Sequence, residues 1–128
     1  MDQTIIIGSG MAGIACARAL ADAGLPVRVL DKGRGIGGRM ATRRVALPTG
    51  EVTFDHGAQY MRPRDPAFAQ ALATAGAVAW PDGSVHDRLV GMPGMSSVPR
   101  AMAAGLTVSQ QAEVTAMVRQ DGFWTLET

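Results

Sequence analysis

The fold is decided by the stretch Ile5-Ile6-Ile7-Gly8-Ser9-Gly10-Met11-Ala12-Gly13. Its apolar start predicts a buried strand over Gln3–Ile7, and the alanine-rich segment Met11–Ala23 predicts a helix. A second apolar run, Val27–Leu30, predicts another buried strand, which ends at the acidic residue Asp31. Strand, helix and strand together predict an α/β, Rossmann-like fold built on one βαβ unit.

The three glycines of this stretch have distinct physical tasks in a dinucleotide-binding loop. Gly8 allows the tight turn out of the strand, Gly10 lets the backbone approach a pyrophosphate, and Gly13 lets the helix pack against the strand. The helix N-terminus presents free N–H groups and a positive dipole end to the phosphates. Asp31 is placed to accept hydrogen bonds from ribose hydroxyls. The alternative is a chance glycine pattern in a loop, and the order of strand, helix and acid argues against it.

A second glycine-rich segment follows, Asp31-Lys32-Gly33-Arg34-Gly35-Ile36-Gly37-Gly38-Arg39. Gly37 and Gly38 would let the backbone come close to a cofactor, and Arg39 offers a planar cation for a phosphate or a flavin carbonyl. The segment therefore favours FAD over NAD as the bound nucleotide. The alternative is a flexible surface loop with a solvated arginine. Residues 32–44 as a whole are predicted to be irregular.

A third cluster, Asp55-His56-Gly57-Ala58-Gln59-Tyr60, combines small residues with groups that form hydrogen bonds. Such a segment suits a position against an isoalloxazine ring. His56 is a candidate for acid–base work, although a structural hydrogen bond is favoured for it. Tyr60 fits two positions equally, one beside the flavin and one half-buried in the core. No nucleophile–base pair and no metal-ligand spacing is recognised, so the sequence assigns no catalytic residue and no metal site.

The remaining sequence predicts short elements separated by turn signals. Asp65-Pro66 predicts the N-cap and the first residue of a helix that ends near Ala75. Asp121-Gly122 is a hairpin turn signal, with one strand over Ala112–Val118 before it and another over Phe123–Leu126 after it. The other predicted elements are strands over Glu51–Asp55, Val78–Trp80, Val85–Val90 and Leu106–Ser109, and a helix from Ser96 or Ser97 to about Ala104.

Composition narrows the class of protein. The chain has 128 residues, of which 47% are hydrophobic and 18% charged, as is typical of a globular domain. A net charge of +1 argues against a nucleic-acid or membrane-surface role that depends on charge. We expect no membrane span and no signal peptide. The single cysteine, Cys16, is expected to be a small buried residue, and the lack of a disulfide partner fits a cytoplasmic location.

A family resemblance rests on four segments, Ile7–Gly13, Asp31–Thr42, Phe54–Tyr60 and Val90–Ser97. Together they resemble the bacterial renalase-like branch of the flavin-containing amine oxidase superfamily. The resemblance implies an oxidoreductase with non-covalent FAD bound across the βαβ unit. It also implies oxidation of dihydro-isomers of NAD(P)H, or of an amine, with hydride passing to the flavin N5 and electrons then passing to oxygen.

The resemblance also implies roles for single residues. Met11 and Ala12 would reach the pyrophosphate, and Arg39 would approach the phosphates or the flavin. Asp31 would contact the adenosine ribose, and the backbone of Val114 would meet the adenine. Motifs and resemblance together give the predicted cofactor-binding set: Gly8, Gly10, Met11, Ala12, Gly13, Asp31, Lys32, Gly38, Arg39, Met40, Ala58, Gln59, Tyr60 and Val114.

The chain departs from this family in length, because the members are more than twice as long. Residues 1–128 are then expected to be the N-terminal FAD/NAD(P)-binding portion, with the beginning of a substrate-domain insertion at about residues 60–100. Three functions stay open: a renalase-like oxidase, another amine-oxidase-type flavoprotein, and a non-catalytic nucleotide-binding module. The expected partners are a small-molecule substrate and oxygen, with neither nucleic acid nor a membrane.

Overall fold

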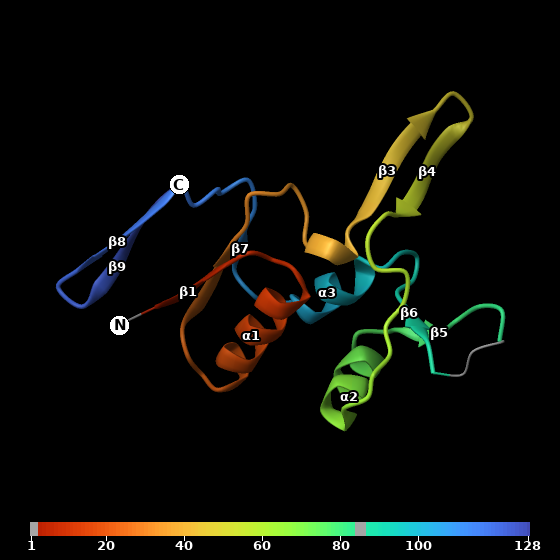
Figure 1. The fold of residues 1–128 in the computed structure, drawn as a ribbon, viewed down its shortest axis with the longest axis horizontal. Coiled ribbons are helices and arrows are strands. Elements are labelled where there is room, and N and C mark those ends of the chain that lie inside the picture. Colours follow the sequence, from red (N-terminus) through yellow and green to blue (C-terminus); the bar gives the residue numbers. More distant parts are fainter. Residues whose placement is uncertain (1–2, 84–86) are drawn as a thin grey trace.

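A computed structural model describes residues 3–83 and 87–128, and its central feature is a parallel β-sheet (Figure 1). The sheet contains β1 (Thr4–Ile7), β2 (Val27–Leu30) and β7 (Val108–Ser109), in the order β1-β2-β7. Neighbouring strands run parallel, and the helix α1 (Met11–Asp22) connects β1 to β2. The predicted α/β, Rossmann-like fold is confirmed, and the bounds of β2 agree with the apolar run in the sequence.

The end of α1 is fixed by a glycine in the left-handed region. Gly24 has a φ of +75°. Its N–H donates to the Ala21 carbonyl, and the N–H of Leu25 donates to the Leu20 carbonyl, both at 2.9 Å. This pair of bonds satisfies carbonyls that the helix would otherwise leave open. The chain can therefore turn at once into β2.

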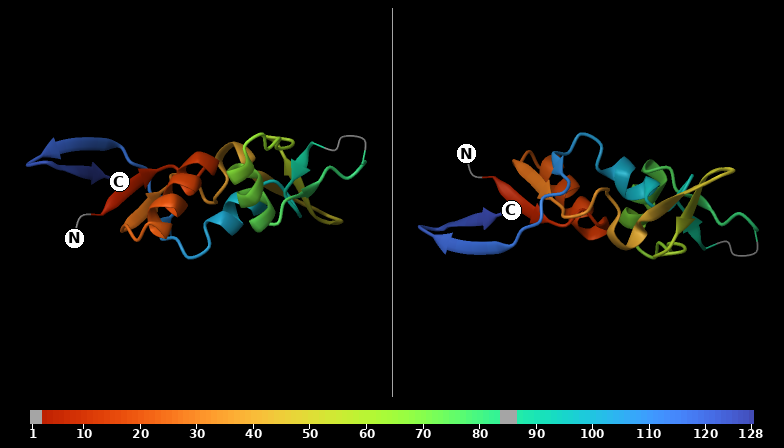
Figure 2. Two further views of the ribbon diagram at one scale, coloured as in Figure 1. Left: turned by 90° about the horizontal axis from the view of Figure 1, so that it is seen from below. Right: turned by 90° about the horizontal axis from the view of Figure 1, so that it is seen from above.

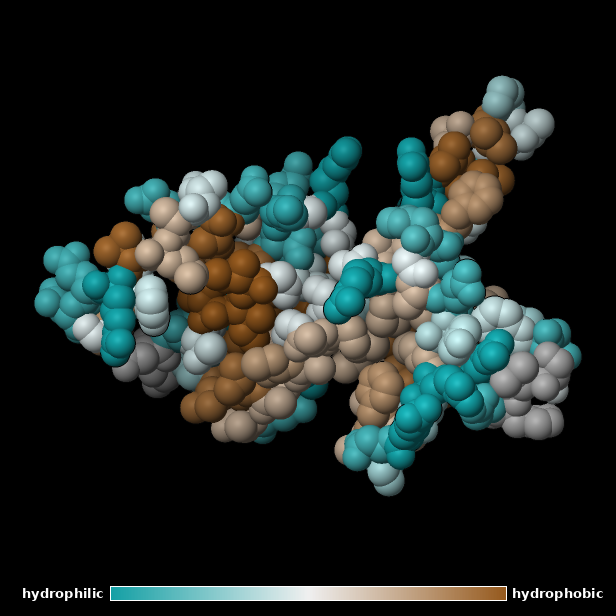
Figure 3. Space-filling view, viewed as in Figure 1, coloured by the Kyte–Doolittle hydropathy of each residue, from teal (hydrophilic) through white to brown (hydrophobic). Residues whose placement is uncertain are grey.

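A hairpin of β3 (Thr42–Leu47) and β4 (Gly50–Asp55) projects away from the sheet (Figure 1). The predicted strand over residues 51–55 is confirmed. The irregular structure predicted for residues 32–44 is interrupted by a short 3₁₀ helix, η1 (Gly38–Met40), and is wrong from residue 42 onward, where β3 begins. The reason is pairing, because every residue of β3 lies opposite a residue of β4. The side chains of Leu47 and Phe54 are exposed on this hairpin. Figure 3 shows apolar surface over the projecting hairpin.

Short elements fill the chain between β4 and β7. Asp65 caps the helix α2 (Pro66–Thr74) as predicted, since its Oδ1 accepts the N–H of Phe68 at 2.9 Å. Ser96 occupies the N-cap position of the last helix, but its side chain makes no capping hydrogen bond. That helix also ends earlier than predicted. The strand predicted over residues 85–90 begins outside the described residues. The elements are α2 (Pro66–Thr74), β5 (Val78–Ala79), β6 (Leu89–Val90) and α3 (Ser97–Met102).

The C-terminal part forms a second hairpin, β8 (Ala116–Gln120) and β9 (Phe123–Glu127). Its turn, Asp121-Gly122, has φ values of +51° and +86°, as expected for an Asp-Gly hairpin turn. The strand predicted from residue 112 begins only at β8. The N–H of Ala112 instead donates to the Asp31 carbonyl at 2.9 Å. The chain before β8 therefore runs along the loop that follows β2.

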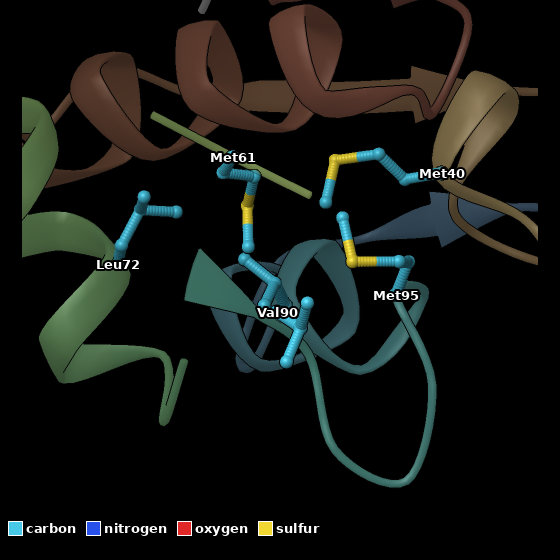
Figure 4. Close-up of a cluster of buried hydrophobic side chains, with 6 residues drawn as sticks. Met40, Met61, Leu72, Val90 and Met95 are labelled. Carbon is cyan, nitrogen blue, oxygen red and sulfur yellow. The ribbon is translucent and has the colours of Figure 1, made fainter. Parts of the chain in front are cut away.

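A buried hydrophobic cluster consists of side chains from α2, α3, β6 and the connecting segments (Figure 4). Three methionines contribute flexible, polarisable side chains that fill irregular gaps. Figure 2 shows that these elements and the sheet with α1 occupy neighbouring parts of an elongated molecule. The cluster contains Met40, Met61, Leu72, Val90, Met95 and Val98.

The helix surfaces correct one expectation. Cys16 is exposed, so its predicted buried position is wrong. Ile14 and Ala17 are the buried residues of α1, and Cys16 faces away from them because only one side of the helix packs against the sheet. Among residues 3–83 and 87–128, none of the helices combines the length and apolar character needed to cross a membrane.

Candidate functional site

A cavity of about 680 Å³ opens at the carboxyl ends of β1 and β2. Ile7 and Asp31 lie where these two strands end, and the glycine-rich loop over residues 33–36 forms another wall. Residues 112–114, which include Val114, form a third wall. Ligands of open α/β folds bind at this edge of the sheet, because the loops there are free to surround them. We call this space the adenosine-side cavity, after the adenosine contacts that the sequence predicts for Asp31 and Val114.

The Asp31 side chain is held in place by backbone amides. Its Oδ2 accepts the N–H of Ser9 at 2.5 Å, and its Oδ1 accepts the N–H of Gly33 at 2.6 Å. Burial favours the neutral acid, but these hydrogen bonds and the charge of Lys32 outweigh it, so the pKa of Asp31 lies below its ordinary value of 3.8. The carboxylate is therefore ionised at neutral pH and keeps lone pairs for hydroxyl donors.

Backbone hydrogen bonds bring Val114 to the same cavity as Asp31. The N–H of Gln111 donates to the Gly33 carbonyl at 2.9 Å, next to the bond between Ala112 and the Asp31 carbonyl. The segment that follows β7 is therefore fastened to the loop that follows β2. This pairing places the predicted adenine-side residue and the predicted ribose-side residue on walls of one cavity.

A second cavity, of about 1020 Å³, lies on the other side of the glycine loop. It shares Ile7, Gly8 and Gly38 with the adenosine-side cavity, so the two spaces meet at the turn between β1 and α1. Its walls are more apolar, and we call it the α1-side cavity. Of the predicted cofactor-binding residues, this cavity brings together Gly8, Gly10, Met11, Ala12, Gly13, Gly38, Arg39, Met40 and Ala58.

The geometry of the glycine loop explains two of its glycines. Gly8 has a φ of +103°, a conformation that disfavours any residue with a side chain. A Cβ at Gly13 would lie 2.0 Å from the Gly8 carbonyl oxygen, so α1 could not approach β1 this closely. A Cβ at Gly10 would meet nothing nearer than the Gly38 Cα, at 3.8 Å. The fold itself therefore leaves the surface of Gly10 free.

Two predicted residues take other positions. Among the described residues that line the two cavities, neither Gln59 nor Tyr60 is found. Tyr60 is half-buried, with its ring edge-to-face against Trp80 at a centroid distance of 6.0 Å. The guanidinium of Arg88 lies 4.4 Å from the centre of the Tyr60 ring. Of the two positions that the sequence left open for Tyr60, the structure has the core position.

Met40 and Asp55 make contacts that hold the fold together. Met40 belongs to the buried cluster and also touches the α1-side cavity. The Asp55 Oδ1 accepts the hydroxyl of Thr42 at 2.6 Å and the N–H of Met95 at 3.0 Å. These bonds tie the base of the β3–β4 hairpin to the segment before α3. Asp55 thus supports the region around the cavity rather than lining it.

Sequence reasoning missed the contribution of the later helices. Arg100, on α3, lines the adenosine-side cavity, and Phe68 and Met102 line the α1-side cavity. No motif marks these residues, since they reach the cavities only because α3 packs against α1 and α2 forms a further wall of the α1-side cavity. The sequence held only a partial signal, because Arg100 is a single basic residue in the short helix α3.

The fold and the paired cavities define a dinucleotide-binding Rossmann-like unit. A family profile described as an NAD(P)-binding Rossmann-like domain matches residues 6–75, more than half of the sequence. The chain belongs to this family. The matched region contains the glycine loop, Asp31 and the second glycine-rich segment.

Comparisons with individual proteins give short matches. The chain is 47% identical over 52 residues to one component of the ferredoxin/F(420)H(2)-dependent CoB-CoM heterodisulfide reductase of Methanosarcina acetivorans. It is 45% identical over 52 residues to the corresponding component of the ferredoxin:CoB-CoM heterodisulfide reductase of Methanosarcina mazei. Each match covers 41% of this chain and 7% of the relative, so the chain spans a small part of these proteins. A mutant of putrescine oxidase aligns with a TM-score of 0.47 and 31% identity, over 60% of this chain and 16% of that one.

Proposed function

We propose that this chain binds FAD non-covalently and is the cofactor-binding part of a renalase-like, flavin-dependent oxidoreductase. The observation that carries the proposal is the arrangement of Asp31, Val114 and the N-terminus of α1 around two cavities that share Gly8 and Gly38. An elongated dinucleotide needs such a path, with a ribose acceptor at one end and backbone amides at its middle.

The residues present fit this cofactor. The ionised Asp31 suits the hydroxyls of an unphosphorylated ribose, because a ribose phosphate would meet its negative charge. Gly10 leaves the backbone open at the first turn of α1, where free N–H groups favour a diphosphate. The apolar walls of the α1-side cavity suit an aromatic ring system.

The role proposed for each residue follows from the cavity that it lines. Asp31 and Lys32 bind the ribose side, and Val114 orients the adenine through its backbone. Bound FAD would supply the hydride-accepting chemistry, with a dihydronicotinamide or an amine as reductant and oxygen as final acceptor. The proposed diphosphate and flavin contacts are the predicted residues that line the α1-side cavity: Gly8, Gly10, Met11, Ala12, Gly13, Gly38, Arg39, Met40 and Ala58.

In this proposal the described chain is one FAD-binding unit, and residues at about 60–100 begin a substrate domain. The identity to the heterodisulfide reductase components spans 52 residues and supports only a shared nucleotide-binding region. The choice of substrate therefore rests on the resemblance of the motifs. The proposal includes a cytoplasmic location and a small-molecule substrate.

The experiment is a binding measurement on the purified chain. The protein is incubated with excess FAD, desalted, and examined for retained flavin absorbance, with NAD⁺ as a competitor. Retained flavin that NAD⁺ does not displace is the expected result. A colourless protein would contradict the proposal. Turnover with dihydronicotinamide isomers then separates an oxidase from a non-catalytic binding module.

A further inference from the structure

Arg100 is a cation that reaches the adenosine-side cavity from a separate element. It lies on α3, and its side chain is exposed to the cavity. A terminal nitrogen of its guanidinium lies 3.8 Å from the position that a Cβ at Gly35 would take. The group therefore stands directly beside the glycine-rich loop that follows β2.

The backbone that carries Arg100 is anchored at both ends of α3. At the C-terminal end, Arg18 of α1 donates its Nε to the Met102 carbonyl at 3.1 Å and a terminal nitrogen to the Ala104 carbonyl. At the N-terminal end, the N–H of Ser96 donates to the Thr42 hydroxyl at 3.2 Å. The helix that carries Arg100 is thus fastened to α1, the predicted phosphate-binding helix, at one end and to the start of β3 at the other.

The charged side chains that line the adenosine-side cavity include more basic than acidic groups, which favours an anionic ligand. Its acidic residues are Asp31 and Glu113, and its basic residues are Lys32, Arg34 and Arg100. Two backbone amides already satisfy part of the Asp31 carboxylate. A dinucleotide brings a diphosphate with two negative charges, and a planar guanidinium is the side chain best suited to bind one of them in a bidentate manner.

We infer that Arg100 is a diphosphate ligand of the bound dinucleotide, acting from α3 in addition to the N-terminus of α1. The inference rests on the proposed function and adds a residue outside the glycine motifs. Because the proposed contact is to phosphate, the affinity for adenosine, which has no phosphate, should not depend on Arg100.

A neighbouring pocket gives the competing location for a phosphate. This pocket, of about 90 Å³, is lined by Arg100 together with Arg44, Thr53 and Ser97. Arg44 lies 4.0 Å from Glu51, so part of its charge is compensated. If an anion occupied this pocket, loss of Arg44 should matter as much as loss of Arg100.

The test is isothermal titration of the full chain with FAD, ADP and adenosine. R100A should weaken FAD and ADP binding by about tenfold or more, while adenosine binding stays unchanged, and R100K should recover part of the loss. R64A is the matched control, because Arg64 is an exposed arginine that lines neither cavity among the described residues, and it should bind all three ligands normally. Circular dichroism of each variant checks the fold.

The outcomes that overturn the inference are distinct. Equal FAD affinity of R100A and R64A would remove Arg100 from the site while leaving the proposed function intact. An equal loss of adenosine binding in R100A would indicate a structural role. A loss in R44A as large as in R100A would place the phosphate in the smaller pocket. A wild-type chain that binds neither FAD nor ADP would contradict the proposed function itself.

Discussion

Gly10 and Gly13 stand in the same loop, yet the space around them differs. A Cβ at Gly13 would meet the Gly8 carbonyl oxygen at 2.0 Å, whereas a Cβ at Gly10 has no neighbour within van der Waals overlap. Gly13 is therefore required by the contact between α1 and β1. The fold does not require a glycine at position 10, and in the proposed function Gly10 leaves room for the diphosphate of the cofactor.

This difference predicts opposite results for two alanine variants. G13A should lower the free energy of unfolding by about 1–3 kcal/mol, because backbone atoms must move to admit the methyl group. G10A should keep the stability of the wild type and weaken FAD binding. Urea unfolding and FAD titration of both variants check this pair. A stable G13A, or a G10A with normal FAD affinity, would contradict the assignment.

Asp31 predicts a pH dependence of stability. Its pKa in the folded chain is lowered, so the carboxylate contributes stability above its ordinary pKa of 3.8, and this contribution is lost as the pH falls through the folded-state pKa. Relative to D31N, the wild type should therefore hold a constant advantage near neutral pH, which shrinks in acid. Urea unfolding of both proteins from neutral to acidic pH measures it. An advantage that grows in acid would contradict the sign.

At the scale of elements, α1 and α3 are joined by one side chain. Arg18 lies one-third exposed on α1 and donates to two carbonyls at the end of α3. Its third contact is an ion pair with Asp22 on the same helix, at 3.4 Å. The carbonyl contacts fasten two elements together, whereas the ion pair stays within one exposed helix surface.

These contacts predict a clear order of effects. R18A should cost about 1–2 kcal/mol of stability, because charged donors to helix-end carbonyls are lost. D22A removes only the exposed ion pair and should cost about 0.5 kcal/mol or less. Thermal unfolding of the two variants makes the comparison. Equal costs would mean that the carbonyl contacts contribute little.

The elements that the sequence predicts best are those with a local signal. β2 has its own apolar run, and α2 has its cap at Asp65, so both appear where expected. β3 has no such signal, because its conformation depends on pairing with β4. Arg100 could not be placed at a cavity for the same reason, since its position depends on how α3 packs against α1.

At the scale of the whole molecule, the two tryptophans report on different regions. Trp80 is half-buried and packs against the buried cluster and Tyr60. Trp124 belongs to the C-terminal hairpin and is 61% exposed. The indole of Trp80 therefore reports on the buried cluster, and the indole of Trp124 reports on a solvent-exposed surface.

Single-tryptophan variants test this arrangement. W124F, which keeps Trp80, should emit at shorter wavelength and resist quenching by acrylamide. W80F, which keeps Trp124, should emit at longer wavelength and be quenched efficiently, since its indole meets solvent. Steady-state fluorescence with a quencher titration gives both quantities. Similar quenching of the two variants would contradict the exposures described above.

The order of strands in the sheet has a consequence for how the chain reaches its native state. β1 and β2 are close in sequence, and Thr4 pairs with Val27, so their contact closes a short loop. β2 and β7 pair through Val29 and Val108, which requires most of the chain to be in place. Because residues 112–114 follow β7, the cavity wall that they form depends on this longer closure, whereas Asp31 directly follows β2. A complete cavity therefore needs the pairing of β2 with β7 as well as that of β1 with β2.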